Sequence, residues 1–277
     1  MLDLPRSARL AAWGTGVLTG AAGVDAAVAA VVRDDEPHAV RWDAAAAPAH
    51  PRELRELLPA LAGAGCGALL LALPVPGDPR GLPGPPEVNT AALRAGECVL
   101  AEPAGAPAGA PAGAAGVAGA AGRWALVPEV TEFGSVWEPG AMVTWAVLAA
   151  APRRAPESSS VADCERELRL ALATATRALA SLDVARWRED AADRIAAVRD
   201  GGLARDALPP GTSPRAARVL QTAARVLAIV DLAAEDDGAA LTSFEATSRA
   251  QALREVAGVA RRALVAAVNA HAEPVRA

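Results

Sequence analysis

The stretch that decides the fold reads GALLLALPVPGDPRGLPGPPEVNTAALRAGECVLAE and covers residues 67–102. It starts with a continuous apolar run over residues 67–73, which is typical of a strand buried on both faces of a sheet. A loop dense in Pro and Gly follows, and we expect a helix over residues 89–94 that ends at Gly96. A second strand is predicted over residues 97–102. This order of elements indicates a sheet that carries helices on it.

The segments on either side continue the alternation of helices and strands. Apolar spacing predicts helices over residues 10–21 and 24–31, with Ser7 as a good N-cap for the first. A short strand is expected over residues 38–42, and then a helix that starts near Pro51. Two further strands are predicted over residues 123–130 and 141–150. Residues 1–151 therefore predict an α/β to α+β domain with a mixed sheet and helices.

The second half of the chain has a different pattern. Residues 103–122 are a low-complexity insertion of Ala, Gly and Pro with one Val, and residues 152–160 are predicted to be a linker. Over residues 161–277, apolar residues recur at helical spacing, and helix-start signals occur at Ser160, at Ser213 with Pro214, and at Thr242. Small residues on these apolar stripes permit close helix approach. We expect an all-α bundle of three or four helices there.

Composition and charge argue against several classes of function. Hydrophobic residues make up 52% of the 277 residues and charged residues 21%, which is typical of a globular protein. The net charge is −5, and residues 1–150 hold 15 acidic residues against 9 Arg. Nucleic-acid binders and anionic-membrane binders need a basic surface, so both are disfavoured. Binding of nucleic acid by Arg residues of the helical half stays open as a third option.

The N-terminal residues and the cysteines bear on location. Residues 10–24 are uncharged and follow two Arg residues, as in a signal peptide, but four glycines interrupt them. No window is apolar enough over about 20 residues to span a bilayer. The three cysteines, Cys66, Cys98 and Cys164, are an odd number and suit a reducing compartment. We therefore expect a cytoplasmic protein.

The sequence contains no assembled set of catalytic or metal-binding residues. The chain has no Lys, which the phosphate-binding loop of NTPases requires, and no G-x-S-x-G motif. His38, His50 and His271 are expected on the surface or at caps. The cysteines form no C-x-x-C pattern, so no zinc site is indicated. We predict no catalytic residue, no metal site and no cofactor.

Two smaller features have competing interpretations. Cys66 between two glycines is either a reactive thiol on a tight turn or, as we favour, a small residue packed at a strand entrance. Glu129, Glu132 and Glu138 surround Trp137 and offer paired carboxylates for acid–base work. Strand alternation places Glu129 and Glu132 on opposite faces, however, so a solvated turn between strands is favoured.

The Pro-rich loop, residues 74–87, is the best candidate site. It follows the C-terminal end of a buried strand and enters a helix, a place where α/β proteins bind ligands. Asn89 and Thr90 are expected to cap that helix and leave amide donors for an anion. Its six prolines lack the N–H groups of a phosphate cradle and instead fix a stiff wall suited to docking. The residues proposed to bind a ligand are Asp78, Arg80, Asn89 and Thr90.

Three segments carry a resemblance to a known family. They are PVPGDPRGLPGPP (residues 74–86), ALASLDVARW (residues 178–187) and AIVDLAAEDDGAA (residues 228–240). The chain resembles an uncharacterised actinobacterial protein family with no assigned activity, and the resemblance spans most of its length. It implies a cytoplasmic actinobacterial protein and transfers no catalytic residue.

The function expected from these features is that of a non-catalytic cytoplasmic interaction or regulatory protein. It would bind a protein partner through the Pro-rich loop, because that loop is stiff and no catalytic set accompanies it. The alternative is an enzyme or sensor that binds a small anionic metabolite at residues 77–90. The sequence does not predict the oligomeric state.

Overall fold

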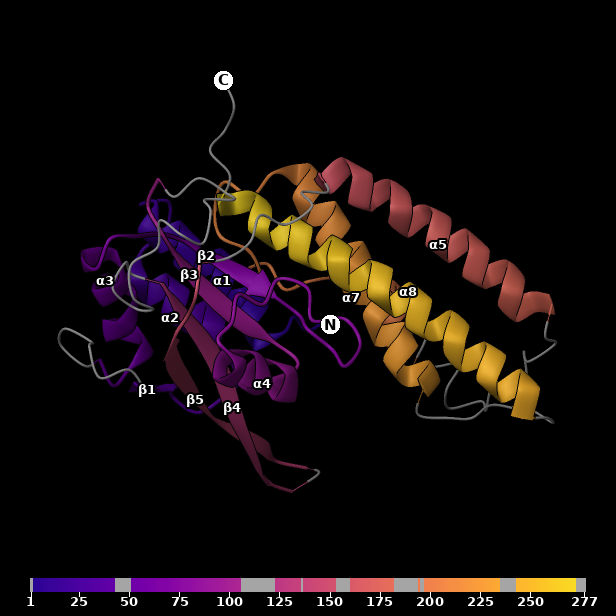
Figure 1. Cartoon of the computed structure of the whole chain (residues 1–277), viewed down its shortest axis with the longest axis horizontal. Helices are drawn as coiled ribbons and strands as arrows, with labels where there is room; N and C mark the ends of the chain where they lie inside the picture. Colours follow the sequence, from indigo (N-terminus) through magenta and orange to yellow (C-terminus); the bar gives the residue numbers. More distant parts are fainter. Residues whose placement is uncertain are drawn as a thin grey trace. The chain divides into compact units, whose positions relative to one another are not determined.

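The apolar run at residues 67–73 lies, except for Leu73, in one edge strand of a five-stranded mixed sheet. The computed structural model describes residues 2–42, 51–105, 123–135, 137–152, 160–181, 194, 197–234 and 243–272. The sheet has the strand order β1-β5-β4-β3-β2 (Figure 1). Its strands are β1 (Ala39–Trp42), β2 (Cys66–Ala72), β3 (Cys98–Pro103), β4 (Trp124–Gly134) and β5 (Pro139–Ala149). β1 and β5 are parallel and the other pairs are antiparallel, so the mixed sheet is confirmed.

The connection from β2 to β3 has the predicted order of loop and helix, and the structure adds the direction in which the two strands pair. The chain passes through the Pro-rich loop and α4 (Pro86–Ala95), yet β2 and β3 are antiparallel, with Ala72 paired to Cys98. The end of β2 therefore lies beside the start of β3. Ligand sites of α/β proteins form at the carboxyl ends of parallel strands. The Pro-rich loop follows the C-terminal end of β2 and enters α4, as expected, but the adjacent strand β3 is antiparallel, so two parallel strands do not end together at this edge.

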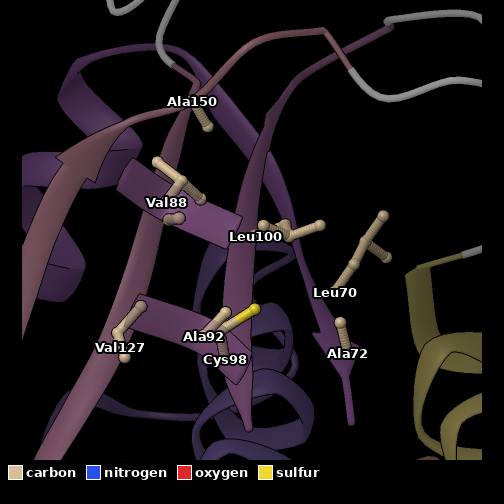
Figure 2. Packing of buried hydrophobic residues seen from close by; sticks show 9 residues of the cluster. Leu70, Ala72, Val88, Ala92, Cys98, Leu100, Val127 and Ala150 are labelled. Carbon is tan, nitrogen blue, oxygen red and sulfur yellow. The ribbon is translucent and has the colours of Figure 1, made fainter. Parts of the chain in front are cut away.

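One face of the sheet is covered by α4 and the Pro-rich loop. Side chains from β2, β3 and β4 meet Val88 and Ala92 of α4 in a buried cluster (Figure 2). Leu82 of the Pro-rich loop packs against the same cluster, and the N–H of Ala151 donates to the carbonyl of Gly84 at 3.0 Å. The cluster consists of Leu70, Ala72, Val88, Ala92, Cys98, Leu100, Ala125, Val127 and Ala150.

The opposite face carries α1 (Arg6–Leu18), α2 (Val24–Val32) and α3 (Leu54–Gly63). Successive strand residues point to opposite faces, so Leu69 points away from the α4 cluster that contains Leu70. A Cβ added at Gly14 of α1 would lie 2.3 Å from Leu69 Cδ1, which shows how closely α1 approaches β2. α3 buries an apolar face, which consists of Leu54, Leu57, Leu58 and Leu61.

A single hydroxyl group satisfies the outer edge of β2 at Leu69. Thr15 Oγ1 donates to the carbonyl of Leu69 at 2.9 Å and accepts from its N–H at 2.9 Å. β2 is the last strand in the sheet order, so these two backbone groups point away from β3. Buried backbone groups without a partner lower the stability of a fold. Thr15, which lies within α1, provides the partner for both groups of Leu69.

The C-terminal part consists mainly of helices in the residues that the structure describes. It contains α5 (Val161–Ser181), α7 (Pro214–Ala234) and α8 (Ser243–Asn269), and α8 contacts both α5 and α7. Two predicted N-caps are confirmed: Asp163 N–H donates to Ser160 Oγ, and Ala216 N–H donates to Ser213 Oγ, each at 3.1 Å. No helix among the described residues is both long and apolar enough to cross a membrane.

The chain divides into two compact units that do not follow the sequence continuously. One contains Met1–Leu4, Ser159–Arg205 and Ser213–Ala270, and the other contains Pro5–Ser158, Asp206–Thr212 and His271–Ala277. The second of these includes the whole sheet. Within it, Trp13 Nε1–H donates to the carbonyl of Asp206 at 3.1 Å. Residues 206–212 are therefore part of the packing of the sheet unit.

Three predicted helix starts were wrong. α1 begins at Arg6 with Pro5 as its N-cap, so Ser7 lies in the first turn. α3 begins at Leu54, three residues after Pro51. α4 begins at Pro86 rather than at residue 89, because Pro is well suited to a first turn, where no N–H is needed. Residues 106–122 of the insertion, 153–159 of the linker, Trp187 and the predicted cap at Thr242 lie outside the described residues.

Candidate functional site

The Pro-rich loop is folded on itself. Val75 and Asp78 exchange backbone hydrogen bonds at 2.8 and 3.1 Å around Gly77, whose φ is +87°. Such a positive φ suits Gly, which has no Cβ to clash. Arg80 Nε lies 3.1 Å from Asp78 Oδ1, so this acid and base of the loop pair with each other. The loop therefore presents a small, internally bonded turn with an exposed Arg80.

The four proposed ligand residues fall into two separate groups. Asp78 and Arg80 form their ion pair in the loop, whereas Asn89 and Thr90 lie inside α4. Asn89 Oδ1 accepts the N–H of Gly84 at 2.9 Å, which ties the loop to the helix. The expectation that Asn89 and Thr90 cap α4 was wrong, because the N-cap is Pro85. Ligand binding by these residues stays a prediction.

The start of α4 is poorly suited to an anion. Pro85 and Pro86 have no N–H to donate, and Glu87 adds a negative charge to the first turn. A helix N-terminus attracts anions through its exposed N–H groups and its positive dipole end. Both contributions are weakened here by the residues that the sequence provides. An anion at this loop would rely on the Arg80 side chain.

A buried charged cluster lies on the opposite face of the sheet. Arg6 of α1 donates two hydrogen bonds to Asp35, of 2.8 and 2.6 Å. Arg9 Nη2 lies 3.7 Å from the same carboxylate, and His38 Nε2 lies 3.2 Å from it. Burial raises the pKa of Asp35, but the hydrogen bonds from Arg6 and His38 outweigh this effect and hold it below its usual value.

His38 is locked in one tautomer by its neighbours. Trp145 Nε1 lies 3.1 Å from His38 Nδ1, and an indole N–H only donates, so Nδ1 must accept and Nε2 carries the proton toward Asp35. Burial lowers the pKa of His38 despite the hydrogen bond and charge of Asp35. The expected surface position of His38 was wrong, since the residue is buried. Both ring nitrogens are occupied, so neither is available to a substrate.

Two partly buried titratable groups, Glu97 and His271, have partners within the fold. Glu97 accepts the N–H of Ser7 at 2.7 Å and so occupies the N-terminus of α1. Burial raises the pKa of Glu97 against this hydrogen bond. His271, which the sequence placed on the surface or at a cap, is partly buried, and its Nε2 lies 3.1 Å from Thr212 Oγ1. His50 lies outside the described residues.

The cysteines are buried thiols. None of the three forms a disulfide, and burial raises the pKa of Cys66 and of Cys98 to about 12. A thiolate is the reactive form, so both thiols are unreactive at neutral pH. The interpretation of Cys66 as a packed residue is confirmed by its burial. Among the described residues, no group of three or more His, Cys, Asp and Glu side chains is placed to hold a metal ion.

The most unusual surface lies on the hairpin of β4 and β5. We call residues 129–144 the β4–β5 arm; residue 136 lies outside the description. β3 pairs with β4 only as far as Leu126, and β1 pairs with β5 only from Thr144 onward. The arm therefore extends past both neighbouring strands as a two-stranded ribbon (Figure 1). The predicted strands ended at residue 130 and began at residue 141, so the sequence missed the outer half of this ribbon.

Four of the five large exposed hydrophobic side chains in the described residues belong to the arm. Trp137 at the turn is 92% exposed, Met142 53%, Phe133 46% and Val130 38%. Phe133 is paired with Gly140, and its ring lies over that glycine, where an added Cβ would approach Phe133 Cζ to 2.6 Å. Met142 is the diagonal neighbour of Phe133 on the same face. The fifth such side chain is Leu170 of α5, which is 65% exposed.

Acidic side chains surround the apolar part of the arm. Glu129 pairs with Arg41 at 2.5 Å, while Glu132 and Glu138 are exposed. Glu129 and Glu132 are on opposite faces, as predicted, so the three carboxylates form no acid–base pair. The arm contains three Glu and no Arg or Lys. The arm therefore combines exposed apolar side chains with exposed carboxylates.

Sequence reasoning missed the arm for an identifiable reason. Residues 129–134 alternate weakly between polar and apolar side chains, and their Glu residues favour a solvated turn. The available signal was Trp137, a large aromatic residue within a turn rich in Ser, Glu, Pro and Gly. Thr15 and the His38–Trp145 pair gave no signal, because their partners are 54 and 107 residues away.

Comparison with known proteins supports one assignment. No curated protein and no solved structure has a significant match to the chain. Two family models match, the Rv1486c-like protein N-terminal domain over residues 7–158 and the Rv1486c-like protein C-terminal domain over residues 162–265. Together they cover most of the sequence and agree with the resemblance seen in its three segments. The chain belongs to the Rv1486c-like protein family.

Proposed function

We propose that this chain is a non-catalytic interaction protein and that the β4–β5 arm is its docking surface. The observation that carries the proposal is the exposure of Trp137, Phe133 and Met142 on one projecting hairpin. Exposed apolar groups gathered in one place mark interaction sites on soluble proteins. Trp in particular is enriched among the residues that dominate binding energy.

The chemistry of the buried polar groups supports a non-catalytic role. His38, Asp35 and Glu97 are engaged in hydrogen bonds inside the fold, and the thiols of Cys66 and Cys98 are held protonated. We further propose a cytoplasmic location, which suits three cysteines without a disulfide. For the C-terminal part, contact of α8 with both α5 and α7 supports a bundle of three or four helices.

The test is affinity capture with the full chain from cells that naturally produce it. Trp137→Ser should abolish capture of the specific partner, because it removes the most exposed apolar side chain of the arm. Leu170→Ser is the matched control, since it removes an exposed apolar side chain outside the arm and should leave capture intact. Equal capture by both variants and the unchanged chain would exclude the arm as the docking surface.

The Pro-rich loop is a second docking surface to be separated from the arm. Pro76, Pro79 and Arg80 are exposed, and the turn between Val75 and Asp78 fixes the loop shape. The double variant Pro76→Ser, Pro79→Ser makes the loop less stiff without touching the arm. It should leave capture unchanged if the arm is the docking surface, whereas loss of capture would assign the partner to the loop.

The alternative function, an enzyme or sensor of a small anionic metabolite, rests on Arg80 at the Pro-rich loop. Its side chain is 68% exposed and can turn from Asp78 to an anionic ligand. The experiment is a thermal-shift screen with inorganic phosphate and di- and tricarboxylates, since a ligand of the native state raises the unfolding midpoint. A rise that Arg80→Gln abolishes would establish this function, and no rise with any of these anions would refute it.

A further inference from the structure

We infer that the partner of the β4–β5 arm is a protein surface with an apolar pocket bordered by Arg and Lys residues. This inference rests on the proposed docking function of the arm and adds the chemistry of its partner. Its starting point is the charge of the arm, which has three Glu and no basic residue in residues 129–144. Only Glu129 has an ion-pair partner among the ion pairs that the structure gives for the arm.

The apolar groups define the centre of the contact. Phe133 and Met142 are diagonal neighbours on one face of the ribbon, and Trp137 lies at its tip. The ring of Phe133 lies over Gly140, which has no side chain to cover it, so the ring stays 46% exposed. Buried aromatic side chains at the centre of an interface supply most of its binding energy. A partner must therefore offer an apolar pocket for at least one of these side chains.

The acidic groups define the rim of the contact. Glu132 faces the side of the ribbon opposite Phe133, and Glu138 follows Trp137 directly in the turn. Both side chains are exposed, so they are available to a partner at the edge of the contact. Complementary charges at a rim steer association and reject wrong partners. Arg and Lys on the partner would meet these carboxylates.

The same charges exclude three other occupants. Two arms from two copies of the chain would each bring three Glu to the contact, and like charges placed together are unfavourable. An anionic membrane surface would repel Glu132 and Glu138 beside the inserting Trp137. A nucleic acid requires a basic surface, which the arm lacks. A basic protein surface is the occupant that matches both the apolar centre and the acidic rim.

The experiment places a photo-crosslinker at the arm in cells that naturally produce the protein. p-Benzoylphenylalanine replaces Thr131, an exposed residue on the same face as Phe133, and Ala173 of α5 is the control position. Mass spectrometry identifies the molecule and the segment that become crosslinked. The affinity of the purified partner is then measured calorimetrically at 50 and 300 mM salt for the unchanged chain, Trp137→Ser and the double variant Glu132→Gln, Glu138→Gln.

The expected result is a crosslink from position 131 to a protein segment of net positive charge, without the same crosslink from position 173. Trp137→Ser should weaken binding by about tenfold or more, as loss of a central aromatic side chain does. The double Gln variant should weaken binding at low salt and make it less sensitive to salt, because screening acts on the charge pairs that it removes.

Other outcomes overturn the inference in distinguishable ways. A crosslinked partner that is neutral or acidic, or binding that salt does not affect, would refute the basic partner and leave the arm as a docking surface. A crosslink to a second copy or to lipid would replace the proposed partner by that occupant. Absence of any crosslink specific to position 131 would refute both this inference and the proposed docking function.

Discussion

At the scale of single residues, a few side chains form hydrogen bonds with buried polar groups that no backbone group reaches. Thr15 satisfies both backbone groups of Leu69 with one hydroxyl, and Trp145 satisfies the acceptor nitrogen of His38. Each of these pairs is buried and joins elements that are far apart in sequence. Their free energies therefore depend on the whole fold being formed, which makes them sensitive probes of it.

Thr15→Val should be strongly destabilising although the two side chains have nearly the same shape. The substitution leaves the N–H and the carbonyl of Leu69 without their partner, and each unsatisfied group costs about 1–3 kcal/mol. We expect the free energy of unfolding in urea to fall by about 2 kcal/mol or more. Thr15→Ser keeps the hydroxyl and should cost only about 1 kcal/mol for the lost methyl group. Equal losses for the two variants would contradict the proposed role of the hydroxyl.

His38 should make the protein less stable as the pH falls below the ordinary His value of 6.5. Its pKa is lowered in the folded protein, so the unfolded chain binds this proton more readily and gains population as the pH falls through that window. Asp35, whose pKa is also lowered, extends the loss below pH 4. Urea unfolding at pH 7.5 and 5.5 measures the effect.

The control for this pH dependence is His38→Gln, which cannot titrate. We expect a smaller loss of stability between pH 7.5 and 5.5 in this variant than in the unchanged chain. His271 also has a lowered pKa through burial, so it should leave some pH dependence in place, which His271→Gln would remove. A pH dependence unchanged by His38→Gln would show that His38 does not contribute to it.

At the scale of elements, the sequence predicted which helices and strands form better than it predicted where they begin and end. The strands β1, β2, β3 and the helices α1, α2 and α3 were expected from apolar spacing, because buried faces impose a period on the residues. The first residues of helices were less predictable. Ser7, Pro51 and Asn89 are residue types that often begin a helix, but α1, α3 and α4 begin at other residues. The antiparallel pairing of β2 with β3 could not be predicted, because local sequence does not encode which strand is adjacent.

In the candidate site, too, features that depend on local sequence were predictable and features that depend on the whole sheet were not. The opposite faces of Glu129 and Glu132 and the packed state of Cys66 followed from local rules of alternation and composition. The projection of the β4–β5 arm depends on where β1 and β3 stop pairing, and their positions result from the whole sheet. The role of Asn89 was missed because its side chain reaches back to Gly84 instead of capping its own helix.

Asn89→Ala should loosen the connection between the Pro-rich loop and α4. The variant removes the acceptor for the N–H of Gly84, at a cost of about 1–3 kcal/mol, against a gain in helix propensity of less than about 1 kcal/mol. We expect a net loss of stability in chemical unfolding. Thr90→Ala, at the neighbouring exposed position, makes the same change in propensity without a lost bond. A stabilised Asn89→Ala variant would show that the bond contributes little.

At the scale of the whole molecule, the unit that contains the sheet is discontinuous in sequence. Residues 206–212 belong to it, and Trp13 donates to the carbonyl of Asp206. Gly16 of α1 is also close to Pro209, since an added Cβ would lie 3.3 Å from it. Residues 159–205 are thus inserted between two parts of one packing unit. A cut at the linker would therefore remove part of the sheet unit.

A fragment of residues 1–158 should be less stable than the same residues in the full chain. It lacks residues 206–212, so the indole of Trp13 loses its acceptor and its cover. We expect a lower unfolding midpoint and a red-shifted Trp fluorescence. Attaching residues 206–212 to the fragment through a Gly/Ser linker should restore part of the midpoint. A fragment as stable as the full chain would show that this segment is dispensable.

The discontinuous unit also has a consequence for synthesis on the ribosome. Residue 206 follows residue 158 by 48 positions, which corresponds to about 2–10 s at typical translation rates of about 5–20 residues per second. During that interval α1 exists without the segment that covers Trp13. The nascent sheet unit must therefore tolerate an exposed indole until residues 206–212 have been translated.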